Sequence, residues 1–244
     1  MFQRTGMLGR ARFAVTNRDG GSSARPYDTL NLGDHVGDDP AAVEQNRRRV
    51  AAAVGFGPAD LVLMRQVHGR DVAVVDGPPG PGDDAPEADA LVTTRRGLVL
   101  TVLVADCTPV LLASPHADVV GVVHAGRRGL AAGVVPAAVD AMRTLGARPS
   151  GVVAHIGPGV CGRCYEVSPT VQSEVAAAVP AALSATRDHR PSLDIPAGVV
   201  AQLAKAGVVT VQSDHCCTAE RVDLYSYRRD GVTGRFAGLA WLPA

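Results

Sequence analysis

The chain has 244 residues, 46% of them hydrophobic, and its 24 basic and 24 acidic residues give a formal net charge of zero. This length suffices for a large core in one domain. The balanced charge excludes the basic footprint of a nucleic-acid-binding protein, and no run reaches the roughly 18 apolar residues of a membrane span, so we expect neither nucleic acid nor membrane as a partner. The first residues lack the apolar stretch of a signal peptide, and the five cysteines are an odd number. The sequence therefore predicts a cytoplasmic protein with free thiols.

The first third of the chain contains two candidate strands and one candidate helix. A strand is expected over residues 8–16. Asp39 and Pro40 are typical of a helix start, as an N-cap and a first-turn proline. A further strand over 61–67 leads to a connection rich in Gly and Pro over 77–88, which is long enough to be a lid or a linker.

The rest of the chain mixes strands and helices. Apolar runs predict strands over 98–104, 109–113, 119–123, 152–156, 208–212 and 235–242. Helical patterns predict helices over 129–145, 169–179 and 194–206. Pro136 is expected to kink the first of these helices or to set its start. Because strands and helices do not alternate strictly, an α+β fold with mixed β-sheets and flanking helices is favoured over a doubly wound one, as a single domain over residues 1–244.

Three polar side chains, His68, Cys107 and His124, follow apolar runs and are flanked by small residues. The runs before Cys107 and His124 predict buried strands, so these side chains are expected at neighbouring strand ends. Two imidazoles and a thiolate form a three-ligand set for Zn²⁺ that leaves one tetrahedral position open, as in catalytic zinc sites. The same residues also permit a metal-free site, with Cys107 as nucleophile and His124 as base.

The remaining cysteines form two short groups. Cys161 and Cys164 have the spacing of a redox or zinc-binding pair, but no second pair lies at zinc-finger distance. Cys216 and Cys217 are adjacent, so both side chains cannot easily face one metal. We expect a structural or incidental role for these four cysteines. The zinc deaminase signature, His-x-Glu followed by Pro-Cys-x-x-Cys, is absent.

A set of short motifs occurs in a fixed order along nearly the whole chain. The motifs are 31–33 (Asn-Leu-Gly), 36–40 (Val-Gly-Asp-Asp-Pro), 66–69 (Gln-Val-His-Gly), 105–109 (Ala-Asp-Cys-Thr-Pro), 123–126 (Val-His-Ala-Gly), 156–158 (Ile-Gly-Pro), 165–167 (Tyr-Glu-Val) and 225–231 (Tyr-Ser-Tyr-Arg-Arg-Asp-Gly). Each motif is weak alone, but the ordered set closely resembles the laccase-domain family of the YfiH/YlmD type. The resemblance implies a CNF/YfiH-like α+β sandwich of the cysteine-hydrolase type, in one laccase domain over residues 1–244.

The resemblance also implies a function. It implies a zinc site with His68, Cys107 and His124 as ligands, with Cu²⁺ as the alternative metal. It further implies phosphorolysis of purine nucleosides, in which adenosine or inosine reacts with phosphate to give the base and ribose 1-phosphate. Adenosine deamination and methylthioadenosine phosphorolysis are implied as accompanying activities. The expected partners are therefore purine nucleosides and phosphate.

The chain departs from the family pattern at one position of the site. The family usually has Trp after His-Ala-Gly, whereas this chain has Arg127 there. Arg128 matches the family's arginine and Arg18 matches an arginine of another segment, so both are candidate anion contacts. We therefore expect loss of Arg128 to weaken the use of phosphate more than loss of Arg127. Glu166 is a candidate for binding the ribose hydroxyls or for forming a salt bridge. Asp106 is a candidate for a catalytic proton acceptor, for a residue that supports the metal ligands, or for the cap of a turn.

An older name of the family implies a second function, a copper-dependent polyphenol oxidase. The sequence disfavours a multicopper centre, because it has seven histidines and no His-x-His pair. A mononuclear copper bound by two imidazoles and a thiolate is the remaining form, with Met64 as a weak axial ligand four residues before His68. Met64 is more readily explained as a core residue.

Overall fold

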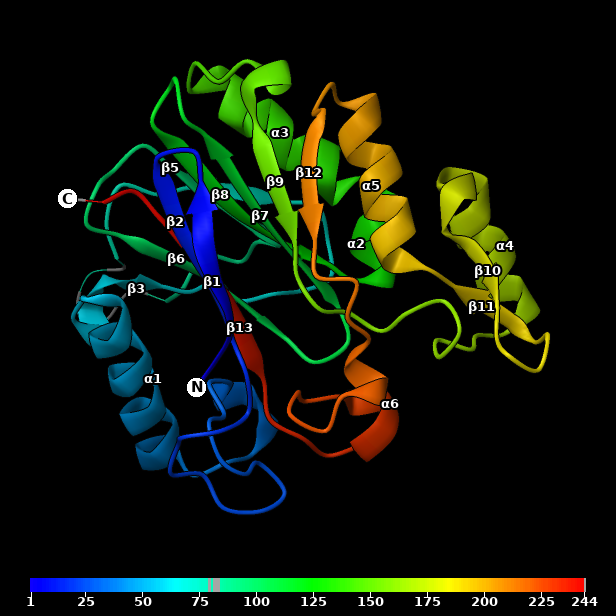
Figure 1. Cartoon of the computed structure of the whole chain (residues 1–244), viewed down its shortest axis with the longest axis horizontal. Coiled ribbons are helices and arrows are strands. Elements are labelled where there is room, and N and C mark those ends of the chain that lie inside the picture. The colour runs from blue at the N-terminus through cyan, green and yellow to red at the C-terminus, as the bar shows by residue number, and fades with distance from the viewer. Residues whose placement is uncertain (79, 81–83, 244) are drawn as a thin grey trace.

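Two β-sheets form the centre of the computed structural model, which describes residues 1–78, 80 and 84–243 (Figure 1). The five-stranded sheet has the order β1-β2-β13-β6-β3. Its strands are β1 (Phe2–Leu8), β2 (Ala11–Thr16), β13 (Phe236–Trp241), β6 (Val99–Val104) and β3 (Leu61–Val62). Neighbouring strands are antiparallel except β3, which pairs with β6 in parallel, so this sheet is mixed.

The six-stranded sheet has the order β12-β9-β7-β8-β5-β4. Its strands are β12 (Thr210–Ser213), β9 (Val153–Ile156), β7 (Thr108–Ser114), β8 (Val119–Ala125), β5 (Ala90–Thr93) and β4 (Val72–Val74). The two edge strands are parallel to their neighbours and the inner pairs are antiparallel. A separate antiparallel pair consists of β10 (Leu183–Ala185) and β11 (Pro191–Leu193).

Helices cover the outer faces of both sheets. The helices of the described residues are α1 (Pro40–Val54), α2 (Arg127–Ala132), α3 (Val134–Thr144), α4 (Pro169–Ala178), α5 (Ile195–Lys205) and the single turn α6 (Tyr227–Asp230). Helix α1 packs on the five-stranded sheet, and α2, α3 and α5 pack on the six-stranded sheet (Figure 1). None of the helices in the described part of the chain is long and apolar enough to cross a membrane.

Strand β8 shows why the central runs are apolar throughout. Val119 and Val123 belong to the core between the six-stranded sheet and the helices, whereas Val120 and Val122 belong to the core between the two sheets. Because side chains alternate between the faces of a strand, both faces of β8 are buried. The next residue on the inter-sheet face is His124, so its imidazole lies at the margin of the inter-sheet core.

The predicted α+β fold with mixed sheets and flanking helices is confirmed. The local signals also hold: the Asp39 side chain accepts a hydrogen bond from the N–H of Ala41, and Gly55 ends α1 in the left-handed conformation with a φ of 89°. The cysteine-hydrolase assignment and the single-domain assignment stay predictions.

The two strands expected early in the chain differ from the prediction. The segment 8–16 contains the turn of a hairpin, in which Leu8 pairs with Ala11 and Gly9 has a φ of 62°. The strand expected over 61–67 is only two residues long. After it, the chain leaves the sheet because backbone N–H groups of 67–69 are bound by the Asp89 carboxylate instead of a neighbouring strand.

The helix expected over 129–145 is two helices. Gly133, with a φ of 88°, ends α2 and precedes α3. Pro136 lies in the first turn of α3, where a helix does not need the N–H that proline lacks. Of the connection predicted over 77–88, residues 79 and 81–83 lie outside the described residues.

Candidate metal centre and its pocket

His68, Cys107 and His124 meet at one margin of the inter-sheet core. Cys107 lies in the turn between β6 and β7, and His124 lies near the end of β8, where it pairs with Pro109. One ligand atom from each of the three residues lies within 4.8 Å of the others, and Cys107 Sγ is 3.8 Å from His68 Nε2. The two imidazole rings meet edge to face at 4.7 Å between centroids. The structure thus brings together the three residues that the sequence predicts as ligands.

The buried carboxylate of Asp89 positions both histidines. Its Oδ1 lies 2.8 Å from His124 Nδ1 and accepts the backbone N–H of His68 at 2.9 Å, while Oδ2 accepts the N–H of Gly69 at 2.6 Å. Burial raises the pKa of Asp89, but the hydrogen bonds from His124 and Gly69 outweigh it and lower this pKa overall. An ionised carboxylate only accepts, so Nδ1 of His124 carries the hydrogen and Nε2 is left to bind a metal.

Cys107 and His124 form a coupled acid–base pair. Burial alone raises the pKa of the Cys107 thiol, but the charge of His124 and hydrogen bonds from both histidines lower it to about 6. Burial correspondingly lowers the pKa of His124, whereas Cys107 and Asp89 raise it to about 9. The site therefore stabilises the thiolate, which is the form that binds metals and acts as a nucleophile.

Gly126 leaves room for the three side chains. A Cβ atom at this position would lie 2.8 Å from His68 Cδ2 and 3.1 Å from Cys107 Sγ. Both distances are shorter than ordinary van der Waals contact, so a side chain here would displace the cluster. The glycine of the His-Ala-Gly motif is thus required by the close approach of the candidate ligands.

Asp106 joins three segments next to the cluster. Its carboxylate accepts hydrogen bonds from Thr218 Oγ1 at 2.5 Å and from the backbone N–H of Arg228 at 2.6 Å. Its carbonyl oxygen accepts the N–H of Val160 at 2.9 Å, and its φ of 93° lies in the left-handed region. Asp106 lines the pocket described next, but its carboxylate is engaged in holding the surrounding segments.

The cluster opens into a pocket of about 680 Å³ with a cationic wall. The ring of Tyr165 lies in this wall, and the guanidinium carbon of Arg228 lies 5.2 Å from its centroid. Arg127 and Arg235 also line the pocket. Among the described residues, the Arg127 guanidinium has no hydrogen bond or ion pair. The other polar residues of the lining are His35, Gln66 and Tyr227.

The predicted substrate contacts lie outside this lining. The Arg18 guanidinium donates to the carbonyl of Asp28 at 2.8 Å and is stacked on Tyr225. Arg128 is exposed and reaches the carbonyl of Val67 at 3.4 Å. The Glu166 carboxylate forms a salt bridge with Arg190 at 3.1 Å, one of the two roles expected for it. Roles of Arg18, Arg128 and Glu166 in substrate binding stay predictions.

Sequence reasoning missed Asp89 and Arg235. The signal for Asp89 was an acidic residue directly before the apolar strand β5. Arg235 is held through its backbone N–H by the buried Asn31 side chain at 2.8 Å, which also binds both polar groups of Gly33. The Asn-Leu-Gly motif therefore has a structural task at the pocket. Met64 is buried in the inter-sheet core and is not among the pocket-lining residues, as expected of a core methionine.

Comparisons with known proteins agree with this site and fold. Residues 12–243 match the family described as multi-copper polyphenol oxidoreductase laccase. A purine nucleoside phosphorylase of Streptomyces griseus is 59% identical over 236 residues, covering 97% of this chain and 96% of that protein. One of Streptomyces coelicolor is 56% identical, covering 95% and 96%. The crystal structure of YlmD from Geobacillus stearothermophilus, 31% identical, superposes with a TM-score of 0.90 over 100% of this chain and 99% of that one. Its relatives and structural neighbours include proteins named YfiH and YlmD. The chain belongs to the multi-copper polyphenol oxidoreductase laccase family.

Proposed function

We propose that this chain is a zinc-dependent purine nucleoside phosphorylase that converts adenosine or inosine and phosphate into the base and ribose 1-phosphate. The observation that carries the proposal is the combination, in one pocket, of a His₂Cys cluster with the side chains of Arg127, Arg228 and Arg235. Its relatives carry the name purine nucleoside phosphorylase. Binding of a phosphate dianion requires such cationic donors, whereas oxidation of a phenol does not.

The donor set fits zinc. His68, Cys107 and His124 would bind the ion through two nitrogens and one sulfur, a set that suits zinc better than the oxygen-preferring Mg²⁺ or Ca²⁺. Asp89 holds His124 through Nδ1, the arrangement that commonly orients a metal-binding histidine. When bound, zinc supplies Lewis-acid chemistry at its open position.

The arginines are suited to positioning the phosphate. Phosphorolysis forms a bond from a phosphate oxygen to the anomeric carbon of ribose and breaks the bond to the purine, which leaves with the electron pair. Arg127, Arg228 and Arg235 would bind the dianion and hold one oxygen in line with that carbon. The ring of Tyr165 offers an apolar surface in the same pocket, and a volume of about 680 Å³ is within the usual range for a small-molecule site.

Adenosine deamination and methylthioadenosine phosphorolysis belong to the same proposal. Methylthioadenosine needs the same phosphate site with an apolar ribose substituent. Deamination would use water as the nucleophile in place of phosphate, and zinc would supply Lewis-acid chemistry for that reaction. Both activities should therefore be lost together with phosphorolysis when a metal ligand is replaced.

The test is an assay of purine release from inosine and adenosine with and without phosphate. Release should require phosphate and should yield ribose 1-phosphate in equal amount. Equal rates in phosphate-free buffer, with free ribose as product, would replace phosphorolysis by hydrolysis. Metal removal by a chelator should abolish activity, and Zn²⁺ should restore it.

Two alternatives use the same three residues. The family description favours copper, and two imidazoles with a thiolate also suit that metal. The thiolate-stabilising contacts of Cys107 with His124 favour a metal-free thiol hydrolase or amidase. Restoration of phenol oxidation by Cu²⁺ after chelation would support the first alternative, and hydrolysis that survives chelation would support the second.

A further inference from the structure

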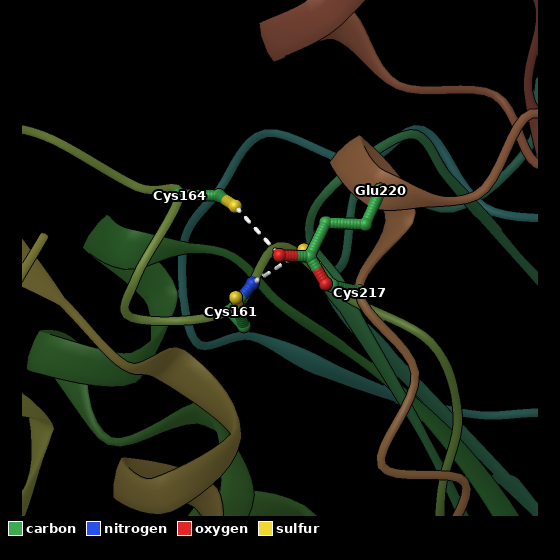
Figure 2. Close-up of side chains that lie close together, drawn as sticks. All are labelled: Cys161, Cys164, Cys217 and Glu220. Atoms are coloured by element: carbon green, nitrogen blue, oxygen red, sulfur yellow. Dashed lines mark hydrogen bonds between the residues drawn. The ribbon is translucent and has the colours of Figure 1, made fainter. Parts of the chain in front are cut away.

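A second group of thiols lies outside the pocket wall. Cys161 and Cys164 come from the segment between β9 and α4, and Cys217 precedes a one-turn helix, Thr218–Glu220, that follows β12. Figure 2 shows the side chains of these three cysteines and of Glu220 close together. One ligand atom from each of the four residues lies within 4.8 Å of all the others.

The two segments are already held in place by their backbones. The N–H of Gly159 donates to the carbonyl of Cys216 at 3.3 Å, and the N–H of Thr218 donates to the carbonyl of Gly159 at 3.2 Å. Within the turn of Cys-x-x-Cys, the N–H groups of Cys164 and Tyr165 both donate to the carbonyl of Cys161. The arrangement of the thiols is therefore set by main-chain pairing between segments more than fifty residues apart.

Contacts of the side chains show the same convergence. The backbone N–H of Cys161 donates to Cys217 Sγ at 3.3 Å, and the Cys164 thiol lies 3.5 Å from Glu220 Oε1 (Figure 2). The Arg187 guanidinium also donates to Glu220, which places a positive charge beside the group.

We propose that Cys161, Cys164, Cys217 and Glu220 bind one Zn²⁺ in a second site, distinct from that of His68, Cys107 and His124. Three thiolates and a carboxylate are ligands that zinc accepts, and thiolates select it over Mg²⁺ and Ca²⁺. With bonds of about 2.3 Å, tetrahedral zinc requires sulfur atoms roughly 3.8 Å apart. Side-chain rotations that draw the ligand atoms together by about 1 Å or less would reach that geometry from the present limit of 4.8 Å.

The second site would be structural. All four positions of a tetrahedral ion would be filled by the protein, which leaves none for a substrate. A pocket of about 350 Å³ lined by Cys161, Cys217 and Glu220 gives the ion a path from solvent. Cys216 also lines this pocket but is not part of the ligand cluster, so it provides a matched control.

The site would stabilise the pocket wall. Tyr165 follows Cys164 directly, and Thr218, next to Cys217, donates to the Asp106 carboxylate. Val160, next to Cys161, donates to the Asp106 carbonyl. A metal that joins the two segments would thus hold the parts of the chain that organise Asp106 and Tyr165. This inference does not depend on the reaction that the pocket catalyses.

The experiment is a titration of reduced, metal-stripped full-length protein with Co²⁺, followed by absorption, and with Zn²⁺, followed by elemental analysis after gel filtration. We expect two ions per chain in the wild type and in C216S, and one in the C161S/C164S double variant. In C107S the first site should be lost, while the thiolate-to-cobalt absorption of the second site persists. The milder variants C164S and E220Q should fold, and their affinity for the second ion should be at least tenfold weaker than that of the wild type.

Two results would overturn the second site. One is a wild-type stoichiometry of one, with thiolate-to-cobalt absorption that disappears entirely in C107S. The other is a disulfide between Cys161 and Cys164, seen by mass spectrometry after alkylation without reductant, together with equal zinc contents in the wild type and the C161S/C164S variant.

Discussion

Oδ1 of Asp89 lies 2.8 Å from Nδ1 of His124, and both side chains are buried, with exposed fractions of 0% and 3%. The same oxygen accepts the backbone N–H of His68, which has a φ of 62°. One carboxylate therefore orients one candidate ligand through its ring and holds the other in a backbone conformation that residues other than glycine rarely adopt. Asp89 therefore positions two of the candidate ligands although it is not one of them.

We expect Asp89→Asn to weaken zinc binding about 10- to 100-fold, the usual loss when a partner of a ligating histidine is changed. The amide removes the charge and can turn an NH₂ group toward backbone donors that need an acceptor. Zinc affinity should be measured by competition with a chromogenic chelator. Glu87→Gln, which removes an exposed carboxylate close in sequence that pairs with Arg65, should leave zinc affinity unchanged. Equal affinities of the two variants would show that Asp89 has only a structural role.

Gly126→Ala should abolish stoichiometric zinc binding at the first site while the fold is retained. The added methyl group would lie within 3.1 Å of Cys107 Sγ and closer still to the His68 ring. Gly77→Ala is the control, since a Cβ at that position would meet nothing within 4 Å. Elemental analysis and circular dichroism of both variants provide the comparison, and full zinc occupancy in Gly126→Ala would contradict the crowding argument.

Arg127→Ala should raise the KM for phosphate more than Arg128→Ala does, the reverse of the ranking expected from the family pattern. Arg127 lines the pocket, whereas Arg128 is exposed and contacts the carbonyl of Val67. Loss of a charge-assisted contact costs about 1.5–3 kcal/mol, which corresponds to roughly a tenfold to hundredfold effect. The KM for inosine at saturating phosphate serves as the internal control. A larger phosphate effect for Arg128→Ala would restore the ranking predicted from the sequence.

Cys107 in metal-stripped protein should react with iodoacetamide at a rate that is half-maximal near pH 6. For ordinary thiols the rate is half-maximal near pH 8.5, because their pKa is about 8.5. The lowered pKa means that the thiolate is present above pH 6 and is lost as the pH falls through that value. Mass spectrometry can follow alkylation of this residue alone, and bound zinc should protect it. In His124→Ala, the half-maximal rate should move to higher pH, because the imidazole charge that most lowers the pKa of Cys107 is gone. A profile that does not differ between the two proteins would argue against the thiolate–imidazolium pair.

Local signals in the sequence determined much of the fold. The caps of α1, the apolar runs of β6 and β8 and the ligand types at positions 68, 107 and 124 could all be interpreted without tertiary contacts. These features depend on interactions within a few residues, such as an N-cap hydrogen bond, or on periodic burial, so a short window of sequence contains them.

The tertiary structure alone decided which side chains meet. Asp89 precedes β5 but binds His124 at the end of β8, and Cys217 reaches Cys161 across more than fifty residues. The sequence indicates a pair of cysteines with metal-binding spacing but not the Cys217 that lies beside it, and it does not show that Arg127 lines the pocket. Strand register and the packing of two sheets set these contacts, and neither is encoded in local periodicity. A one-residue shift in strand register would turn the same side chains to the opposite face of the sheet, which is why residue types were predictable and their neighbours were not.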